Sequence, residues 1–189
     1  MSCSTTEKLR RVPSDEDLMI AAGSGDRGAF GQLVERHQTS AWNAAYRFLG
    51  DSAEAEDVAQ EAFLKILDAA PRYQPSASFR TYLYRVITRL CLDHVRKKKP
   101  FYTQTIPHVA AVAPSPLETV TDQEAGQIIR AALESLPSRQ RMVVVLRYYE
   151  GLDYAETASV LETTVKAVER LLSRAREGLE RKLGRFLEV

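Results

Sequence analysis

LPSRQRMVVVLRYYEGLDYAETASVL, from Leu136 to Leu161, is followed almost at once by VKAVERLLSRAR, from Val165 to Arg176. Apolar residues recur at spacings of three and four in both stretches, which is the period of an amphipathic helix. The sequence predicts a helix that ends at Glu150-Gly151, a short helix from Tyr154 to Leu161, a turn at Glu162 to Thr163, and a longer helix. Two short helices joined by a tight turn, the second one amphipathic and basic, have the layout of a helix-turn-helix. The expected buried positions are Met142, Val143, Val145, Leu146 and Tyr149 in the first helix, and Val165, Val168, Leu172, Ala175, Leu179 and Leu183 in the last.

The last helix carries a local surplus of positive charge. From Thr164 to Arg185 there are seven basic residues against three acidic ones, whereas the whole chain has a net charge of only +1. A recognition helix presents its N-terminal residues to base edges and its flanking cations to phosphates. An ordinary helical hairpin with a basic second helix is the alternative. The candidates for base contacts are Lys166, Ala167, Glu169, Arg170 and Ser173, with Arg174 and Arg176 for the DNA backbone.

The chain divides into two helical halves. Apolar residues recur at helical spacing in both, and no segment shows the sustained alternation of a strand. Between the halves, from Lys97 to about Thr121, four prolines interrupt helical hydrogen bonding. We therefore predict an all-α protein of two small helical domains joined by a flexible linker. The expected boundaries are a disordered tail at 1–14, a first domain at 15–97, the linker at 98–122 and a second domain at 123–189.

An acidic helix is predicted in the first half, in GDSAEAEDVAQEAFLKILDAA. Asp51 is placed as its cap, with Glu54 three residues further on. From Asp51 to Asp68 there are six acidic residues against Lys65 alone. The buried stripe should comprise Val58, Ala62, Phe63, Ile66, Leu67 and Ala70, which leaves Asp57, Gln60, Glu61, Leu64 and Asp68 on the other face.

A basic helix is predicted to begin near Phe79. From Phe79 to Lys99 there are seven Lys or Arg residues and one acidic residue. Arg85, Arg89 and Arg96 align along one side, with Tyr82 and Tyr84 among them. Arginines interleaved with aromatic residues suit a surface that holds phosphates and stacks exposed bases, and a solvated arginine face is the alternative. The expected buried residues are Phe79, Leu83, Val86, Ile87, Leu90 and His94.

The composition excludes several classes of protein. Cys3, Cys91 and the three histidines show no metal-ligand spacing, so we expect no metal, no cofactor and no disulfide framework. No apolar run has the length of a signal peptide or a membrane span, which predicts a soluble cytoplasmic protein. No nucleophile, phosphate loop or metal set indicates an enzyme. Cys91 is expected to be a buried, inert thiol, with an oxidation sensor as the alternative.

Three motifs in this order resemble the sigma factors of bacterial RNA polymerase, in particular the small extracytoplasmic-function (ECF) group. AEDVAQEAFLKIL resembles the polymerase-binding helix of the family's second region. FRTYLYRVITRLCLDHVRK resembles the helix that opens and reads the minus-10 promoter element, and the opening stretch resembles the fourth region, which reads the minus-35 element. The resemblance extends from about Asp15 to Leu183, with the linker at the family's position.

The resemblance implies roles for residues of each motif. On the acidic helix, contacts with the clamp helices of the largest polymerase subunit are implied for Asp57, Gln60, Glu61 and Leu64. The loop from Tyr73 to Ser78 corresponds to the place where the family traps a flipped base, which couples recognition to melting. The implied minus-10 residues are Tyr73, Gln74, Ser76, Arg80, Tyr84, Arg85, Thr88 and Arg89.

The implied function is that of a promoter-specificity subunit without catalytic activity. Its partners would be core RNA polymerase, through the clamp helices and the flap, and promoter DNA in double- and single-stranded form. An anti-sigma factor would hold it inactive. Two alternatives stay open: a sigma-like mimic that sequesters an anti-sigma factor, and an independent helix-turn-helix regulator.

The sequence departs from the family's pattern at several positions. Arg89 stands where Asn is frequent, Tyr82 where Trp is frequent, and Glu162 and Lys166 near a frequent Gly. In the last helix, Glu169 replaces a cation and Leu171 replaces an arginine. A glutamate can accept a hydrogen bond from the amino group of cytosine, so we expect altered promoter specificity with binding retained.

Overall fold

The computed structural model of the chain describes residues 12–98 and 120–187, and within them it contains helices and no strand. This confirms the predicted all-α class. The first half contains α1 (Asp15–Gly23), α2 (Arg27–Leu49), α3 (Ser52–Ala69), the 3-10 turn η1 (Ala70–Arg72) and α4 (Phe79–Lys98). The second half contains α5 (Val120–Glu134), α6 (Ser138–Val144), the π-helical turn η2 (Val145–Tyr149), α7 (Tyr154–Val160) and α8 (Val165–Leu187).

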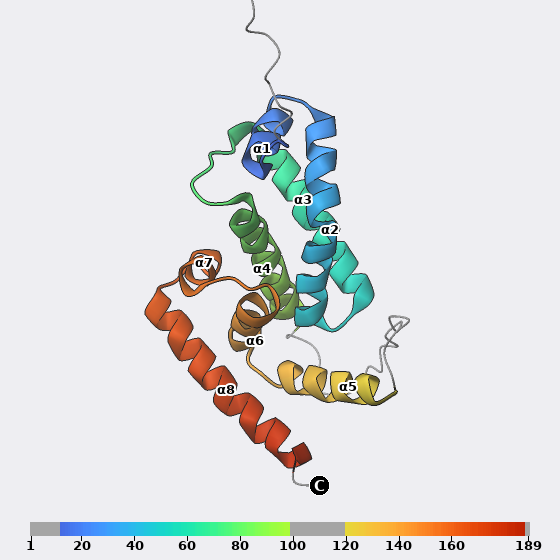
Figure 1. Cartoon of the computed structure of the whole chain (residues 1–189), viewed down its shortest axis with the longest axis vertical. Helices are drawn as coiled ribbons and strands as arrows, with labels where there is room; N and C mark the ends of the chain where they lie inside the picture. Colours follow the sequence, from blue (N-terminus) through green and yellow to red (C-terminus); the bar gives the residue numbers. More distant parts are fainter. Residues whose placement is uncertain (1–11, 99–119, 188–189) are drawn as a thin grey trace, which may run out of the picture.

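The N-terminal domain, residues 12–98, packs α4 against the antiparallel pair of α2 and α3, with α1 across their end (Figure 1). Gly50 ends α2 in the left-handed conformation at a φ of 80°. Asp51 caps α3 as predicted, because its side chain accepts a hydrogen bond of 2.9 Å from the backbone N–H of Glu54. The adjacent Gly50 and Asp51 therefore set the sharp reversal between the two long helices.

The predicted buried stripe of α3 is confirmed except at Leu67, which is 38% exposed. Ala55 and Ala59 also face the core, and they shift the centre of the stripe away from Leu67. On α4, Phe79, Leu83 and Ile87 are buried as predicted, while Val86, Leu90 and His94 are half-buried. Burial extends further round α4 than the sequence pattern indicated, since Tyr84 and Cys91 are also buried.

The C-terminal domain, residues 120–187, contains the predicted helix-turn-helix in α7 and α8. A reciprocal capping box between Asp153 and Glu156 begins α7. Glu162 forms the turn to α8 with a φ of 50°, in the left-handed region that favours glycine. Before the helix-turn-helix, α6 continues into the π turn η2, which inserts an extra residue into the helical repeat. Tyr149 is consequently rotated out of the apolar side and is 42% exposed, contrary to the prediction, as is Val165 at 41%.

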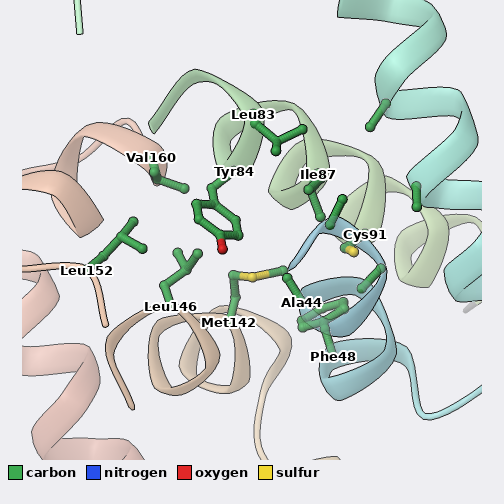
Figure 2. Packing of buried hydrophobic residues seen from close by; sticks show 14 of the residues in the cluster. Ala44, Phe48, Leu83, Tyr84, Ile87, Cys91, Met142, Leu146, Leu152 and Val160 are labelled. Carbon is green, nitrogen blue, oxygen red and sulfur yellow. The ribbon is translucent and has the colours of Figure 1, made fainter. Parts of the chain in front are cut away.

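The two domains lie against each other and share one buried core. Figure 2 shows the Tyr84 ring of α4 among Leu146, Leu152 and Val160 of the C-terminal domain. Nearby, Met142 of α6 points toward Phe48 of α2. The structure is thus a closed arrangement of two domains. Most of the predicted tail and the linker from 99 to 119 lie outside the described residues, and α5 already begins at Val120, within the predicted linker.

The same substitution should have opposite effects on stability at two glycines. A Cβ on Gly23 would lie 2.3 Å from the backbone oxygen of Ala70, so Gly23→Ala forces α1 away from η1 and should cost about 1–3 kcal/mol. At Gly31, exposed within α2, a Cβ would meet nothing within 4 Å, so Gly31→Ala should stabilise by about 0.5–1 kcal/mol. Urea unfolding followed by circular dichroism measures both changes. Midpoints that move in the same direction would contradict this account of the α1–η1 contact.

Candidate nucleic-acid interface

The four residues with predicted polymerase contacts lie together on the exposed side of α3. Asp57, Gln60 and Glu61 are exposed, and Leu64, one turn further along α3, is 62% exposed. Glu61 forms a 3.2 Å ion pair with Lys65 one turn further along. We call Asp57, Gln60, Glu61 and Leu64 the acidic surface. It combines negative charge with one large apolar side chain, which suits a protein partner that carries cations around an apolar patch.

An apolar groove runs beside the acidic surface between α2 and α3. Its volume is about 380 Å³, and Gln60 belongs to both features. The Trp42 ring at its edge stacks on Tyr46 with 4.8 Å between ring centroids. The groove extends the area that a docked partner helix could cover. Its lining residues are Val34, Gln38, Thr39, Trp42, Glu56, Ala59, Gln60 and Phe63.

A cavity of about 210 Å³ lies where the chain passes from η1 to α4. It brings together Tyr73, Gln74, Ser76 and Arg85, four of the residues predicted to contact the minus-10 element. The Tyr73 and Tyr82 rings lie 5.6 Å apart at an angle of 50°. The other lining residues are Ala69, Arg72, Ala77 and Tyr82.

Two buried polar atoms belong to residues that line this cavity and have no hydrogen-bond partner among the described residues. They are the Tyr73 hydroxyl and the Nε of Arg85. Burial is the main cause that raises the pKa of Tyr73 and of Tyr82, so both phenols stay protonated at neutral pH. The tyrosine faces that line the cavity suit stacking with a planar ligand, such as an unstacked base, while the two donor atoms are shielded from solvent.

Two minus-10 arginines on α4, Arg85 and Arg89, contact the C-terminal domain. Arg85 donates from Nη2 to the hydroxyl of Ser159 at 2.9 Å, although sequence reasoning placed it on a DNA surface. Arg89 forms a looser, exposed ion pair of 3.9 Å with Glu162. These arginines therefore have protein partners from α7 and the turn after it in the closed arrangement.

Tyr84 and Thr88 are only 2% and 3% exposed, so in this arrangement neither lines an open single-strand surface as the sequence predicted. The Tyr84 hydroxyl donates to a carboxylate oxygen of Glu150 at 2.5 Å. Burial first, and then this hydrogen bond, raises the pKa of Tyr84 to about 12. The aromatic ring fills an apolar site of the other domain, a contact that the spacing of residues along α4 could not reveal. A DNA role for both residues stays a prediction that requires the domains to separate.

Sequence reasoning did not single out Glu150 as a site residue. Its side chain is 6% exposed and also forms a 2.7 Å ion pair with Arg47 of α2. Arg80 of α4 donates to the backbone carbonyl of the same residue. Because these contacts cross between the domains, no periodic pattern within one helix could have identified them.

The predicted minus-35 residues stay accessible on α8. Ala167 is half-buried, and the other six are exposed. Arg176 donates to the Tyr148 hydroxyl at 2.9 Å, which ties α8 to the π turn η2. The structure therefore presents one face of α8 with the character of a recognition helix. Its exposed members are Lys166, Glu169, Arg170, Ser173, Arg174 and Arg176.

Within residues 12–98 and 120–187, no helix is long and apolar enough to cross a membrane. No group of three or more His, Cys, Asp or Glu residues in those ranges is arranged to hold a metal ion.

Comparisons with known proteins match both halves of the chain. The family model of sigma-70 region 2 matches residues 33–101, and that of sigma-70 region 4 matches residues 126–179. The chain is 32% identical to the ECF RNA polymerase sigma factor SigW of Bacillus subtilis over 84% of this chain and 91% of SigW. It is 34% identical to the ECF RNA polymerase sigma factor SigE of Mycolicibacterium smegmatis over 88% and 68% of the two chains.

Solved structures share the fold. CnrH, in complex with the cytosolic domain of CnrY, aligns with a TM-score of 0.70 at 29% identity and covers 91% of this chain and 98% of its own. The sigma factor RpoE of Bartonella quintana, in complex with the anti-sigma factor NepR, aligns with a TM-score of 0.68 at 18% identity over 82% and 96% of the two chains.

The Cys91 thiol should be unreactive in the folded protein. Its side chain is fully buried on α4, and burial raises its pKa to about 12, so almost no thiolate forms at pH 8. A Cys3→Ser variant isolates this thiol. Ellman's reagent should leave it unlabelled under native conditions and label it fully in guanidinium chloride. Fast native labelling would instead support the oxidation-sensor alternative.

Proposed function

The chain belongs to the extracytoplasmic-function (ECF) sigma factors of RNA polymerase, and we propose that it works through three separate surfaces. Sigma factors are non-catalytic subunits that bind core polymerase, direct it to promoters and help to open the DNA. The observation that carries the proposal is the separation of charge in the structure. One acidic face on α3 and basic faces on α4 and α8 occur in a chain whose net charge is only +1.

The acidic surface on α3 is the proposed docking site for the clamp helices of the largest polymerase subunit. Its support is the exposure of Asp57, Glu61 and Leu64 on one side of a rigid helix, with the apolar groove alongside. A contact with the flap of core polymerase is implied by the family resemblance alone.

The cavity after η1 is the proposed site for a flipped base of the minus-10 element. Its support is the pair of tyrosine rings that line the cavity together with Arg72 and Arg85. A pocket that holds only an extruded base would favour the melted promoter. The single strand would continue along α4 past Arg80, Tyr84, Thr88 and Arg89.

The exposed face of α8 is the proposed reader of the minus-35 element in the major groove. Lys166, Glu169 and Arg170 lie near its N-terminus, where recognition helices meet base edges. A glutamate can accept a hydrogen bond from cytosine, so Glu169 is a candidate for a specificity difference from relatives that carry a cation there.

An inhibitory anti-sigma partner, a cytoplasmic location and the absence of catalytic activity complete the proposal. The similar protein CnrH was solved in complex with the cytosolic domain of another protein, CnrY, which supports a protein partner for this chain. Relatives that work with RNA polymerase support the location. We assign the polymerase and minus-10 surfaces to a domain at 15–97 and the minus-35 surface to a domain at 123–189.

Reversing the charge of Asp57 should weaken binding to core polymerase by about ten-fold or more, because the acidic surface would then repel a basic partner. Asp57 is exposed, so the Asp57→Arg protein should still fold. Fluorescence anisotropy with purified core enzyme measures the affinity. The control is Glu180→Arg, the same charge change on the exposed side of α8. Equal affinities for wild type and Asp57→Arg would contradict this docking site.

Arg85→Glu combined with Arg89→Glu should retain core binding while lowering open-complex formation by about ten-fold or more. The test begins with transcription by core polymerase from a pool of genomic promoters, which identifies the promoters used. Permanganate footprinting on one of them then measures melting. Arg27→Glu on α2 is an exposed control. Unchanged melting would contradict a DNA-binding role for α4. If the wild-type protein supports no transcription at all, the sigma-like mimic that sequesters an anti-sigma factor is favoured instead.

A further inference from the structure

Three side chains of the N-terminal domain converge on one residue of the C-terminal domain. Arg47 pairs with one carboxylate oxygen of Glu150 at 2.7 Å, and the Tyr84 hydroxyl donates to the other at 2.5 Å. Arg80 donates to the Glu150 backbone carbonyl. All the side-chain partners of Glu150 among the described residues thus come from α2 and α4 of the opposite domain.

Local backbone structure presents Glu150 for these contacts. The π turn η2 closes with a hydrogen bond from the Glu150 N–H to the Val145 carbonyl at 3.1 Å, one residue wider than an α-helical bond. Gly151 follows with a φ of 68°, which lets the chain reverse immediately. Glu150 therefore ends a helix whose last turn leans against the N-terminal domain.

The side chains of Arg80, Tyr84 and Arg85 cannot contact the C-terminal domain and DNA at the same time. Tyr84 is buried in the C-terminal domain, and the guanidinium groups of Arg80 and Arg85 donate to Glu150 and Ser159. All three residues belong to the proposed path of the melted strand. Closure therefore covers Tyr84 and occupies donors of Arg80 and Arg85, whereas Gln74, Ser76 and Arg89 stay exposed. The acidic surface on α3 and the exposed face of α8 stay open as well.

We propose that Glu150, with Arg47, Arg80 and Tyr84, forms an autoinhibitory latch that folds the C-terminal domain over the chain's own minus-10 helix. The masking role rests on the proposed DNA role of α4. In the free subunit the latch keeps Tyr84 covered and Arg80 engaged, and release of the Glu150 contacts frees both for the melted strand.

The chemistry of the latch suits a reversible contact. On opening, water can solvate the carboxylate of Glu150 and the guanidinium groups of Arg47 and Arg80, so no charge is left stranded. Within the closed state, by contrast, removal of one partner leaves the other charge buried or poorly compensated. Changes to Glu150 or Arg47 should therefore act mainly on the balance between the closed and open arrangements.

The direct test is single-molecule energy transfer between dyes on the two domains of the full chain. Exposed Ser52 on α3 and Glu180 on α8 are changed to cysteine in a Cys3→Ser background, with Cys91 left buried. Wild type should give one closed population. Glu150→Gln should raise the ratio of open to closed molecules by about ten-fold or more, since it weakens two charge-assisted hydrogen bonds.

Two further variants make the test specific. Arg47→Met alters the opposite domain and leaves the Glu150 carboxylate without its ion pair, so it should open the chain as well. Glu162→Gln is the matched control, because its pair with Arg89 is 3.9 Å long with both side chains more than half exposed. It should leave the population closed. If neither Glu150→Gln nor Arg47→Met increases the open population, the latch is ruled out.

Masking is tested separately with fluorescein-labelled single-stranded DNA that carries the non-template minus-10 segment of a promoter identified by transcription. The isolated Glu150→Gln protein should bind it more tightly than wild type, by about the factor by which the variant opens the chain. Opening without tighter DNA binding would overturn the masking role. If α4 does not bind DNA at all, the permanganate footprinting described above will show it, because the Arg85→Glu and Arg89→Glu protein will then melt the promoter normally.

Discussion

The arrangement of the two domains depends on a buried carboxylate. Glu150 lies at the boundary with its side chain only 6% exposed, and a buried charge is costly unless cations and hydrogen-bond donors surround it. Arg47 and Tyr84 satisfy this requirement, and both belong to the other domain. The position of the C-terminal domain is thus tied to α2 and α4 by the solvation needs of one side chain as well as by apolar contact.

A second constraint is the distribution of charge over the helices. The chain is almost neutral overall, yet α3 carries an acidic surface while α4 and α8 carry basic faces. Because exposed charges are screened over about 10 Å at 0.1 M salt, each surface can act on its own partner with little influence from the others. One small protein can therefore meet a polymerase and a nucleic acid at the same time.

Local patterns predicted the helices well and the domain contact poorly. The cap at Asp51, the end near Glu150 and the turn at Glu162 all follow from short-range chemistry, and the structure has each of them. The acidic and minus-35 residues lie on exposed faces because their side chains point away from their own domain's core. Tyr84 was predicted as a surface residue because its partners come from a domain that lies much further along the sequence.

The backbone winding of the π turn at Val145–Tyr149 sets the direction in which Glu150 points. An α-helix turns by about 100° per residue, so regular α-helical winding through this turn, with all its residues kept, would rotate Glu150 away from α4. Every amino acid that contacts the N-terminal domain could be retained and the domain contact would still be lost. The winding of this turn thus determines domain closure as much as the chemistry of its side chains does.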